Sequence, residues 1–378
     1  MVDQVGADTQ KLAALRAALP AVAAGIYLDA ATAGPLPSET ATALREADEW
    51  ELRVGRGGFD REPELEQREA EAMAVIAALI PDSDPDDIVL TNGSTDALVR
   101  VARASNGYPG RGAIVVRGCI PGANLAVWSS RDGPFQEIEA GDVTEEMARR
   151  TALLVVPVVD YVTGEVIDLD RIINVANQNL GALVIDASAA AGAVPLDPHV
   201  MFSAAEVILP GDRWLLGPEG SGAIRATFRQ HQVLLKAGRE RLPRRSLLGL
   251  ARSVGWLEMY VGLPWIYERT APLAASLAHA LAEIDGVELL TPLDRMAAIV
   301  TFRVKRWSAE QVAEELSHQV GAIVSIVEIP AAEPAIRASV GWWNTEEELG
   351  RFTEAVRLLG AHTPDSIPRR PALTMLPG

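Results

Sequence analysis

Asp212 and Arg213 have the clearest capacity for chemistry, and they directly follow a stretch typical of a buried strand. Residues 205–209 are largely apolar, Pro210 and Gly211 interrupt them, and a glycine-rich turn follows. A carboxylate beside a guanidinium can hold an anion and transfer a proton. The same two neighbours could equally form an exposed ion pair of little energetic value. The sequence leaves both interpretations open.

Further candidates lie at the ends of other predicted strands. Asp186 closes an apolar run, and in an open α/β sheet this end of a strand faces the ligand crevice. Gly93, Ser94 and Thr95 lie between a strand and a helix start, where backbone amides can bind an anion. Serine and threonine are also ordinary N-caps, so this turn alone indicates little. Arg337 begins an Arg-x-Ser sequence and could bind a carboxylate bidentately.

The elements that must position these residues alternate between strands and helices. We expect strands over residues 88–91, 113–117, 153–157 and 183–187, and helices over residues 38–54, 62–80, 169–179, 252–267 and 271–284. Ser38 is the expected N-cap of the first helix. The alternation predicts an α/β fold with a parallel sheet and right-handed crossovers. Strands at 298–303 and 323–327 with helices at 309–320 and 346–359 predict a smaller α+β domain at the C-terminal end.

Composition excludes several classes of partner. The 378 residues carry a net charge of −17, which repels nucleic acid and anionic membranes. No signal-peptide pattern or apolar run of membrane-spanning length is visible. Cys119 is the only cysteine, and the histidines show no metal-ligand spacing. We therefore expect a cytoplasmic protein that binds a small-molecule substrate and no metal, nucleic acid or membrane.

Five motifs in order resemble those of the class V aminotransferases, which include cysteine desulfurases, isopenicillin N epimerase-like proteins and hercynylcysteine sulfoxide lyases. These motifs are Leu28-Asp29-x-Ala31, Thr163-Gly164-Glu165-Val166, Asp186 with residues 192–197, Trp214-Leu215-x-Gly217-Pro218, and Arg337-x-Ser339. The resemblance implies the PLP (pyridoxal phosphate) fold type I, with a mostly parallel sheet of the seven-stranded type. It implies a large domain over residues 25–245 and a small α+β domain formed by residues 1–24 and 246–378. It also implies a homodimer.

The resemblance assigns roles to matching positions. Relatives hold PLP covalently through a lysine where this chain has Arg213, and they pair the pyridinium nitrogen with an aspartate at the position of Asp186. Their phosphate-binding turn corresponds to Gly93, Ser94 and Thr95. Their substrate loop corresponds to the segment containing Thr32, and their carboxylate clamp to Arg337.

The chain departs from this pattern at several cofactor positions. Arg213 cannot form the covalent link, because a guanidinium stays protonated and has no free lone pair. Pro210 and Asp212 replace phosphate-binding residues, Pro121 replaces an aromatic stacking residue, and Ala189 replaces a partner of the ring oxygen. Tight PLP binding is therefore not expected, and we expect no cofactor. Residues 323–336 contain no cysteine, which argues against the desulfurase reaction.

Three functional hypotheses follow. The favoured one is a repurposed, PLP-independent enzyme that performs acid–base chemistry of the lyase, isomerase or transferase type on a small carboxylate-bearing substrate. Its catalytic residues would be Asp212, Arg213 and Asp186, and Arg337, Thr32 and Thr95 would bind the substrate. The second is a PLP-dependent class V enzyme that binds the cofactor non-covalently or borrows Lys236. The third is a non-catalytic pseudoenzyme that binds a partner protein.

Overall fold

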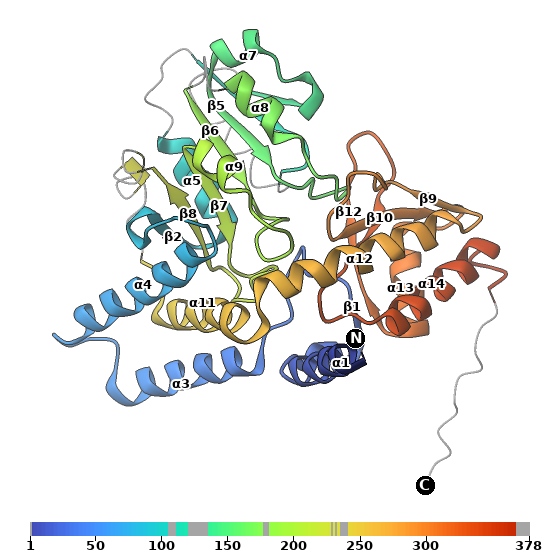
Figure 1. Ribbon diagram of the computed structural model, residues 1–378, viewed down its shortest axis with the longest axis horizontal. Coiled ribbons are helices and arrows are strands. Elements are labelled where there is room, and N and C mark those ends of the chain that lie inside the picture. The colour runs from blue at the N-terminus through green and yellow to red at the C-terminus, as the bar shows by residue number, and fades with distance from the viewer. Residues whose placement is uncertain are drawn as a thin grey trace.

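The computed structural model describes residues 2–104, 111–119, 135–176, 181–227, 230, 233–234 and 241–367, with side chains from residue 8 onward. A seven-stranded sheet forms its largest layer (Figure 1). In spatial order the strands are β2 (Ile88–Thr91), β8 (Gly222–Ala226), β7 (Glu206–Pro210), β6 (Ala182–Asp186), β5 (Thr151–Pro157), β3 (Gly112–Val116) and β4 (Phe135–Ile138). Only β8 runs antiparallel to its neighbours. The predicted α/β fold with a mostly parallel sheet is confirmed.

Both faces of this sheet are buried, which explains why its strands are apolar at successive positions. On one face, Val89, Val115 and Val184 pack with residues of α5 (Gly93–Ala104). The opposite face packs against the helices α4 (Arg61–Ala78), α8 (Leu169–Ala176), α9 (Pro198–Ser203) and α11 (Arg244–Trp256). The sheet is therefore sandwiched between helices, and its carboxyl edge remains for the connecting turns.

A second, four-stranded antiparallel sheet carries its own core. Its spatial order is β12 (Ser325–Val327), β13 (Ala335–Ser339), β10 (Ile299–Val304) and β9 (Val287–Leu289). It packs with α12 (Leu263–Ala282), α13 (Ala309–Val320) and α14 (Glu346–Ala361). This confirms the expected α+β elements, while the division of the chain at residue 245 stays a prediction.

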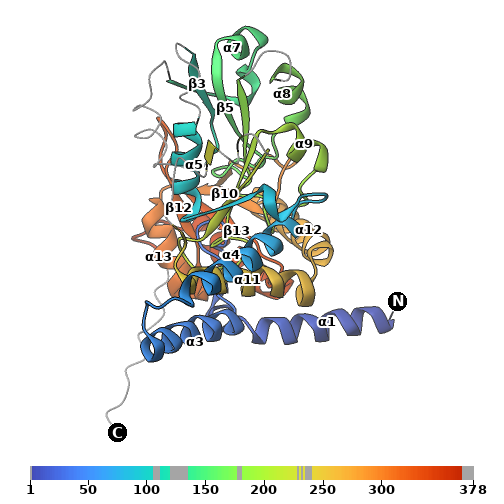
Figure 2. The same ribbon diagram turned by 90° about the vertical axis from the view of Figure 1, so that its left-hand side faces the viewer.

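The N-terminal segment connects the two parts. After α1 (Val2–Ala17) and α2 (Pro20–Ala24), the short strand β1 (Ile26–Tyr27) pairs in parallel with β11 (Ala322–Ile323). Figure 2 shows α1 and α3 (Ser38–Val54) one after the other along one edge of the molecule. Among the described helices, none is both long and apolar enough to cross a membrane.

Two local expectations are wrong. Ser38 is the first residue of α3 and not its N-cap, because Pro37 takes the extended conformation before the helix and no side chain caps it. The expected helix over residues 252–267 is interrupted. A π-helical turn, Leu257–Val261, ends at Gly262, whose φ of 85° suits glycine. The helix α12 then starts in a new direction.

Glu206 is the ionisable residue most at odds with its surroundings in the sheet. It begins β7, is 2% exposed, and its Oε2 has no hydrogen-bond partner among the described residues. Burial raises the pKa of this carboxyl to about 8, from an ordinary value of 4.5. The folded protein therefore holds a proton on Glu206 that the unfolded chain releases at much lower pH.

This burial predicts a pH-dependent stability. Because the folded pKa is raised, the stabilising effect of the proton is complete below the unfolded pKa and is lost as pH rises through about 8. We expect Glu206→Gln to remove this fall and to raise the free energy of unfolding at pH 8 by on the order of a few kcal/mol. Urea denaturation between pH 5 and about pH 9 measures it. The exposed Glu66→Gln is the control, and parallel curves for Glu206→Gln and the wild type would contradict the assignment.

Candidate functional site

The carboxyl edge of the large sheet gathers most of the sequence-predicted site residues. β2, β6 and β7 run in the same direction, so the turn into α5, the end of β6 at Asp186 and the turn after β7 lie along one edge. Gly222, at the start of the returning strand β8, lies against this edge as well: a Cβ there would come within 3.2 Å of Gly93 Cα. The fold thus brings together three turns that are far apart in the chain.

The turn after β7 is held rigidly. The amide of Gly217 donates to the carbonyl of Gly211 at 2.7 Å, and the Ser253 hydroxyl of α11 donates to the carbonyl of Leu216 at 2.7 Å. Trp214 and Leu215 are buried in the core. The backbone of Asp212 and Arg213 is therefore fixed by contacts on both sides.

The N-terminal segment lies directly on this turn. Gly34 donates its amide to the Asp212 carbonyl at 2.9 Å, and a Cβ at Gly34 would come within 2.0 Å of the Arg213 carbonyl oxygen. Only glycine permits this approach. The segment containing Asp29 and Thr32 is thus held next to the turn that carries Arg213.

Arg337 lies at the centre of the contacts between this segment and the small sheet. It sits on β13, is fully buried, and its Nη2 donates to Thr32 Oγ1 at 2.5 Å and to Ser325 Oγ at 3.1 Å. Asp29 Oδ1 lies 3.7 Å from the same nitrogen and also accepts a hydrogen bond from Ser325. The predicted pair Arg337 and Thr32 is therefore in direct contact.

Tyr161, which the sequence analysis missed, connects Arg337 with Arg213. The guanidinium carbons of Arg337 and Arg213 lie 4.0 and 5.0 Å from the centre of its ring. The Tyr161 carbonyl also accepts from Arg337 Nη1 at 3.2 Å. Burial raises the pKa of the Tyr161 phenol, but the charges of Arg337 and then Arg213 outweigh it, so the pKa is lowered. The only sequence signal was its position just before the Thr163-Gly164 turn.

Asp212 and Arg213 do not form the ion pair considered from the sequence. The carboxylate of Asp212 accepts the amide hydrogen of Gly220 at 3.2 Å, whereas the guanidinium of Arg213 lies over Tyr161. Burial raises the pKa of Asp212, and the opposing effects of the Gly220 amide and of Arg213 are smaller. Asp212 also lines a hollow of about 410 Å³ together with Ala33, Gly217 and neighbouring residues.

Asp186 is 2% exposed at the end of β6, and its Oδ1 accepts the amide hydrogen of Ser188 at 2.9 Å. The neighbouring Ser188 hydroxyl is buried without a hydrogen-bond partner among the described residues. Burial, followed by the charges of Asp186 and Asp160, raises the pKa of Cys119 well above its ordinary value. The thiol of Cys119 therefore stays protonated and is unsuited to nucleophilic chemistry.

Gly93, Ser94 and Thr95 form the first turn of α5, with Gly93 at a φ of 81°. The side chain of Thr95 is exposed and that of Ser94 half-buried. Neither hydroxyl takes part in a hydrogen bond with another described residue. The turn therefore keeps free donors at a helix N-terminus, as the anion-binding interpretation requires. Pro121 and Lys236 lie outside the described residues.

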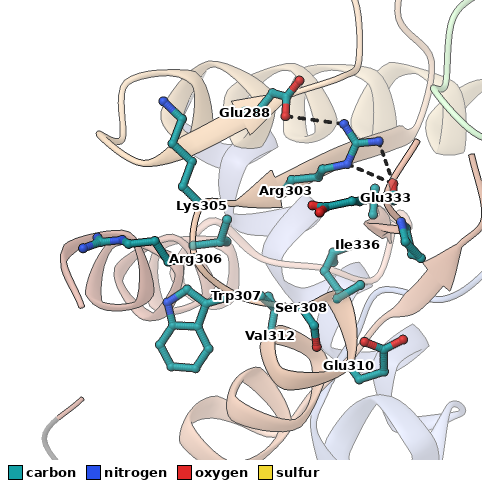
Figure 3. Close-up of a pocket in the computed structure, with 14 residues that line it drawn as sticks. Glu288, Arg303, Lys305, Arg306, Trp307, Ser308, Glu310, Val312, Glu333 and Ile336 are labelled. Carbon is teal, nitrogen blue, oxygen red and sulfur yellow. Dashed lines mark hydrogen bonds and ion pairs between the residues drawn. The ribbon is translucent and has the colours of Figure 1, made fainter. Parts of the chain in front are cut away.

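A separate hollow of about 510 Å³ lies in the small domain, between β10 and the start of α13 (Figure 3). It contains none of the predicted site residues. Its central cation, Arg303, is already paired with Glu288 at 3.4 Å and bonded to the carbonyl of Glu333 at 3.0 Å (Figure 3). No metal-binding cluster is present among the described parts of the chain.

Comparison with known proteins identifies the family. A model of the Aminotransferase class-V family matches residues 26–238, more than half of the chain. The chain therefore belongs to the class V aminotransferase family, as its motifs indicated.

Similar proteins carry cysteine desulfurase and C–S lyase names. A probable cysteine desulfurase of Methanothermobacter thermautotrophicus is 23% identical, over 92% of this chain and 98% of its own. The apo cysteine desulfurase of Thermococcus onnurineus NA1 superposes with a TM-score of 0.80 at 19% identity, covering 92% of this chain and 97% of its own. The cystine C–S lyase C-DES, in a variant with a lysine replaced by alanine and glycine covalently linked to its PLP cofactor, superposes with a TM-score of 0.78 at 16% identity. It covers 90% of this chain and 98% of its own.

These relatives overturn one expectation. The sequence analysis expected no cofactor, but the C-DES structure carries PLP in this fold, in a variant that lacks one of its lysines. Two features of the present chain suit contacts with PLP. Asp186 offers a buried carboxylate beside a Ser188 hydroxyl that has no partner among the described residues, and the first turn of α5 offers the amides of a helix N-terminus, which lack partners within the helix. The error arose because the arginine at position 213, together with Pro210, Asp212, Pro121 and Ala189, was taken to mean that the cofactor was lost.

The contacts of Arg337 predict a large stability effect. In Arg337→Met, the hydroxyls of Thr32 and Ser325 and the Asp29 carboxylate lose their buried cation. We expect a loss of about 3–5 kcal/mol in the free energy of unfolding, because breaking a buried ion pair leaves uncompensated polar groups. Urea denaturation measures it, with the exposed Arg357→Met, which breaks the surface pair with Glu354, as the control expected to cost under about 1 kcal/mol. Equal losses in the two variants would contradict this role.

Proposed function

We propose that the chain is a PLP-dependent class V enzyme of the C–S lyase type that binds its cofactor non-covalently and acts on an amino acid. PLP, when bound, supplies an electron sink that stabilises negative charge on the substrate. The observation that supports this most is the meeting of Asp186 and the first turn of α5 at one edge of the sheet. A buried carboxylate suits a pyridinium nitrogen, and a helix N-terminus suits a phosphate.

Residues of the chain itself are proposed to orient the substrate and to transfer protons. Arg337 is proposed to orient the substrate carboxylate, with Thr32 and Ser325 fixing the guanidinium. Asp212, whose pKa burial raises, is the carboxyl group placed to exchange a proton beside this turn. Tyr161, whose pKa the two guanidiniums lower, is a second group able to hold or release a proton. The protein keeps water from these groups by burying Arg337 and most of Tyr161.

The C–S lyase type is favoured over sulfur transfer to a protein cysteine. Cys119 is the only cysteine, and it is buried with a raised pKa. A thiol in this state is a poor sulfur acceptor. The sulfur cleaved from the substrate would therefore leave the site as part of a small product molecule. A homodimer and a cytoplasmic location belong to the same proposal.

Binding of PLP tests the cofactor assignment directly. We expect the purified protein to take up PLP reversibly, so that borohydride reduction leaves its intact mass unchanged. Arg213→Lys restores an amine at this position, and we expect reduction to attach one pyridoxyl phosphate group to this variant. Intact-mass spectrometry measures both. Covalent labelling of the wild type would point to another lysine, and absence of any PLP binding would refute the proposal.

Asp186→Asn tests the assignment of the buried carboxylate. The amide cannot form the charge-assisted bond to a pyridinium, so we expect PLP to bind about 10- to 100-fold more weakly. Fluorescence titration with PLP measures the affinity, and the exposed Asp170→Asn is the matched control. Unchanged affinity in Asp186→Asn would remove Asp186 from the cofactor site.

A further inference from the structure

The guanidinium of Arg213 is a buried cation without an ionic partner. Arg213 is 9% exposed, and its Nη1 has no hydrogen-bond partner among the described residues. No carboxylate of a described residue forms an ion pair with it, since Asp212 is directed to Gly220. A buried charge without a partner is costly, so its surroundings favour an anion that comes from outside the described chain.

The ring of Tyr161 places this cation close to the other buried arginine. The guanidinium carbons of Arg337 and Arg213 lie 4.0 and 5.0 Å from the centre of the Tyr161 ring. The distance between the two carbons is therefore at most 9.0 Å. This separation is short enough for one small molecule to contact both. The Gly34 contact and the Ser253 hydrogen bond hold the backbone on either side of this side chain, whose guanidinium lies over the Tyr161 ring.

The two cations differ in what compensates them. Arg337 has Asp29 at 3.7 Å and two hydroxyls within hydrogen-bond distance. Among the described residues, Arg213 contacts the face of Tyr161 and has no hydrogen-bond partner for Nη1, because a cation–π contact satisfies no N–H donor. A ligand with a single carboxylate, bound at Arg337, would leave Arg213 uncompensated.

We propose that the crevice selects an amino acid bearing a second acidic group, with Arg337 recognising one carboxylate and Arg213 the other. This inference rests on the proposed function for the identity of the site, and it names the class of substrate. The position that holds a lysine in family relatives would then serve recognition. Guanidinium groups suit this task, because they bind carboxylates through two parallel hydrogen bonds.

Two unreactive probes of equal length, glutarate and pentanoate, separate the second carboxylate from the carbon chain. By calorimetric titration of the full-length protein without PLP, we expect glutarate to bind at least about ten-fold more tightly than pentanoate. Arg213→Gln should remove this preference, so that the variant binds glutarate and pentanoate with similar affinities. Arg213→Lys, which keeps the charge but not the planar pair of donors, should retain part of it. Circular dichroism confirms that both variants are folded.

Several outcomes would overturn the inference. Equal affinities of the wild type for the two probes would do so, as would a preference that survives in Arg213→Gln. A repeat of the titration with PLP present tests whether Arg213 faces the cofactor instead. Abolition of glutarate binding by PLP would overturn the inference, and retained binding supports it.

Inorganic phosphate tests for a general anion site. If phosphate competes with glutarate in the wild type but not in Arg213→Gln, the site binds anions in general and the inference is overturned. Failure of the chain to bind PLP refutes the proposed function alone, because the glutarate preference is measured without the cofactor.

Discussion

Two guanidinium groups buried against one tyrosine ring impose the main electrostatic constraint on this molecule. Arg337 lies on β13 and Arg213 in the turn after β7, and each is removed from water at a cost that must be offset locally. For Arg337, the carboxylate of Asp29 and the hydroxyls of Thr32 and Ser325 offset the cost of burying the charge. Much of the surrounding architecture serves to bring these groups to one place.

The N-terminal segment is the element that makes this arrangement possible. It pairs with β11 of the smaller part through β1, and it contacts the turn after β7 through Gly34. Asp29 and Thr32 lie between these two anchors, so their distances to Arg337 are set by backbone contacts on both sides. A side chain at Gly34 would separate the anchors and disturb the contacts of both arginines.

The sequence predicted the sheet well, since strands buried on both faces leave a strong apolar signal. Family motifs also singled out Arg337 and Thr32 separately, but their contact is a finding of the structure. Tyr161 could not be found in the same way. Its role depends on packing against Arg337, 176 residues away, and on Arg213, and local sequence contains no trace of either contact. The break at Gly262 was missed because one glycine in an apolar helical pattern is compatible with a continuous helix. The expectation of no cofactor was wrong because the replaced positions were given more weight than Asp186 and the first turn of α5, whose contacts do not need a lysine.

The arginine at position 213 gives the site a different charge from that of the lysine that the family resemblance places there. A lysine amine can lose its proton when buried, and then leaves no net charge in the site. A guanidinium stays charged, so the crevice of this chain carries a permanent second cation beside Arg337. The carboxylate of the neighbouring Asp212 accepts the amide hydrogen of Gly220 and forms no ion pair with Arg213. The proposed acidic ligand would provide the counter-charge that the described residues do not place at Arg213.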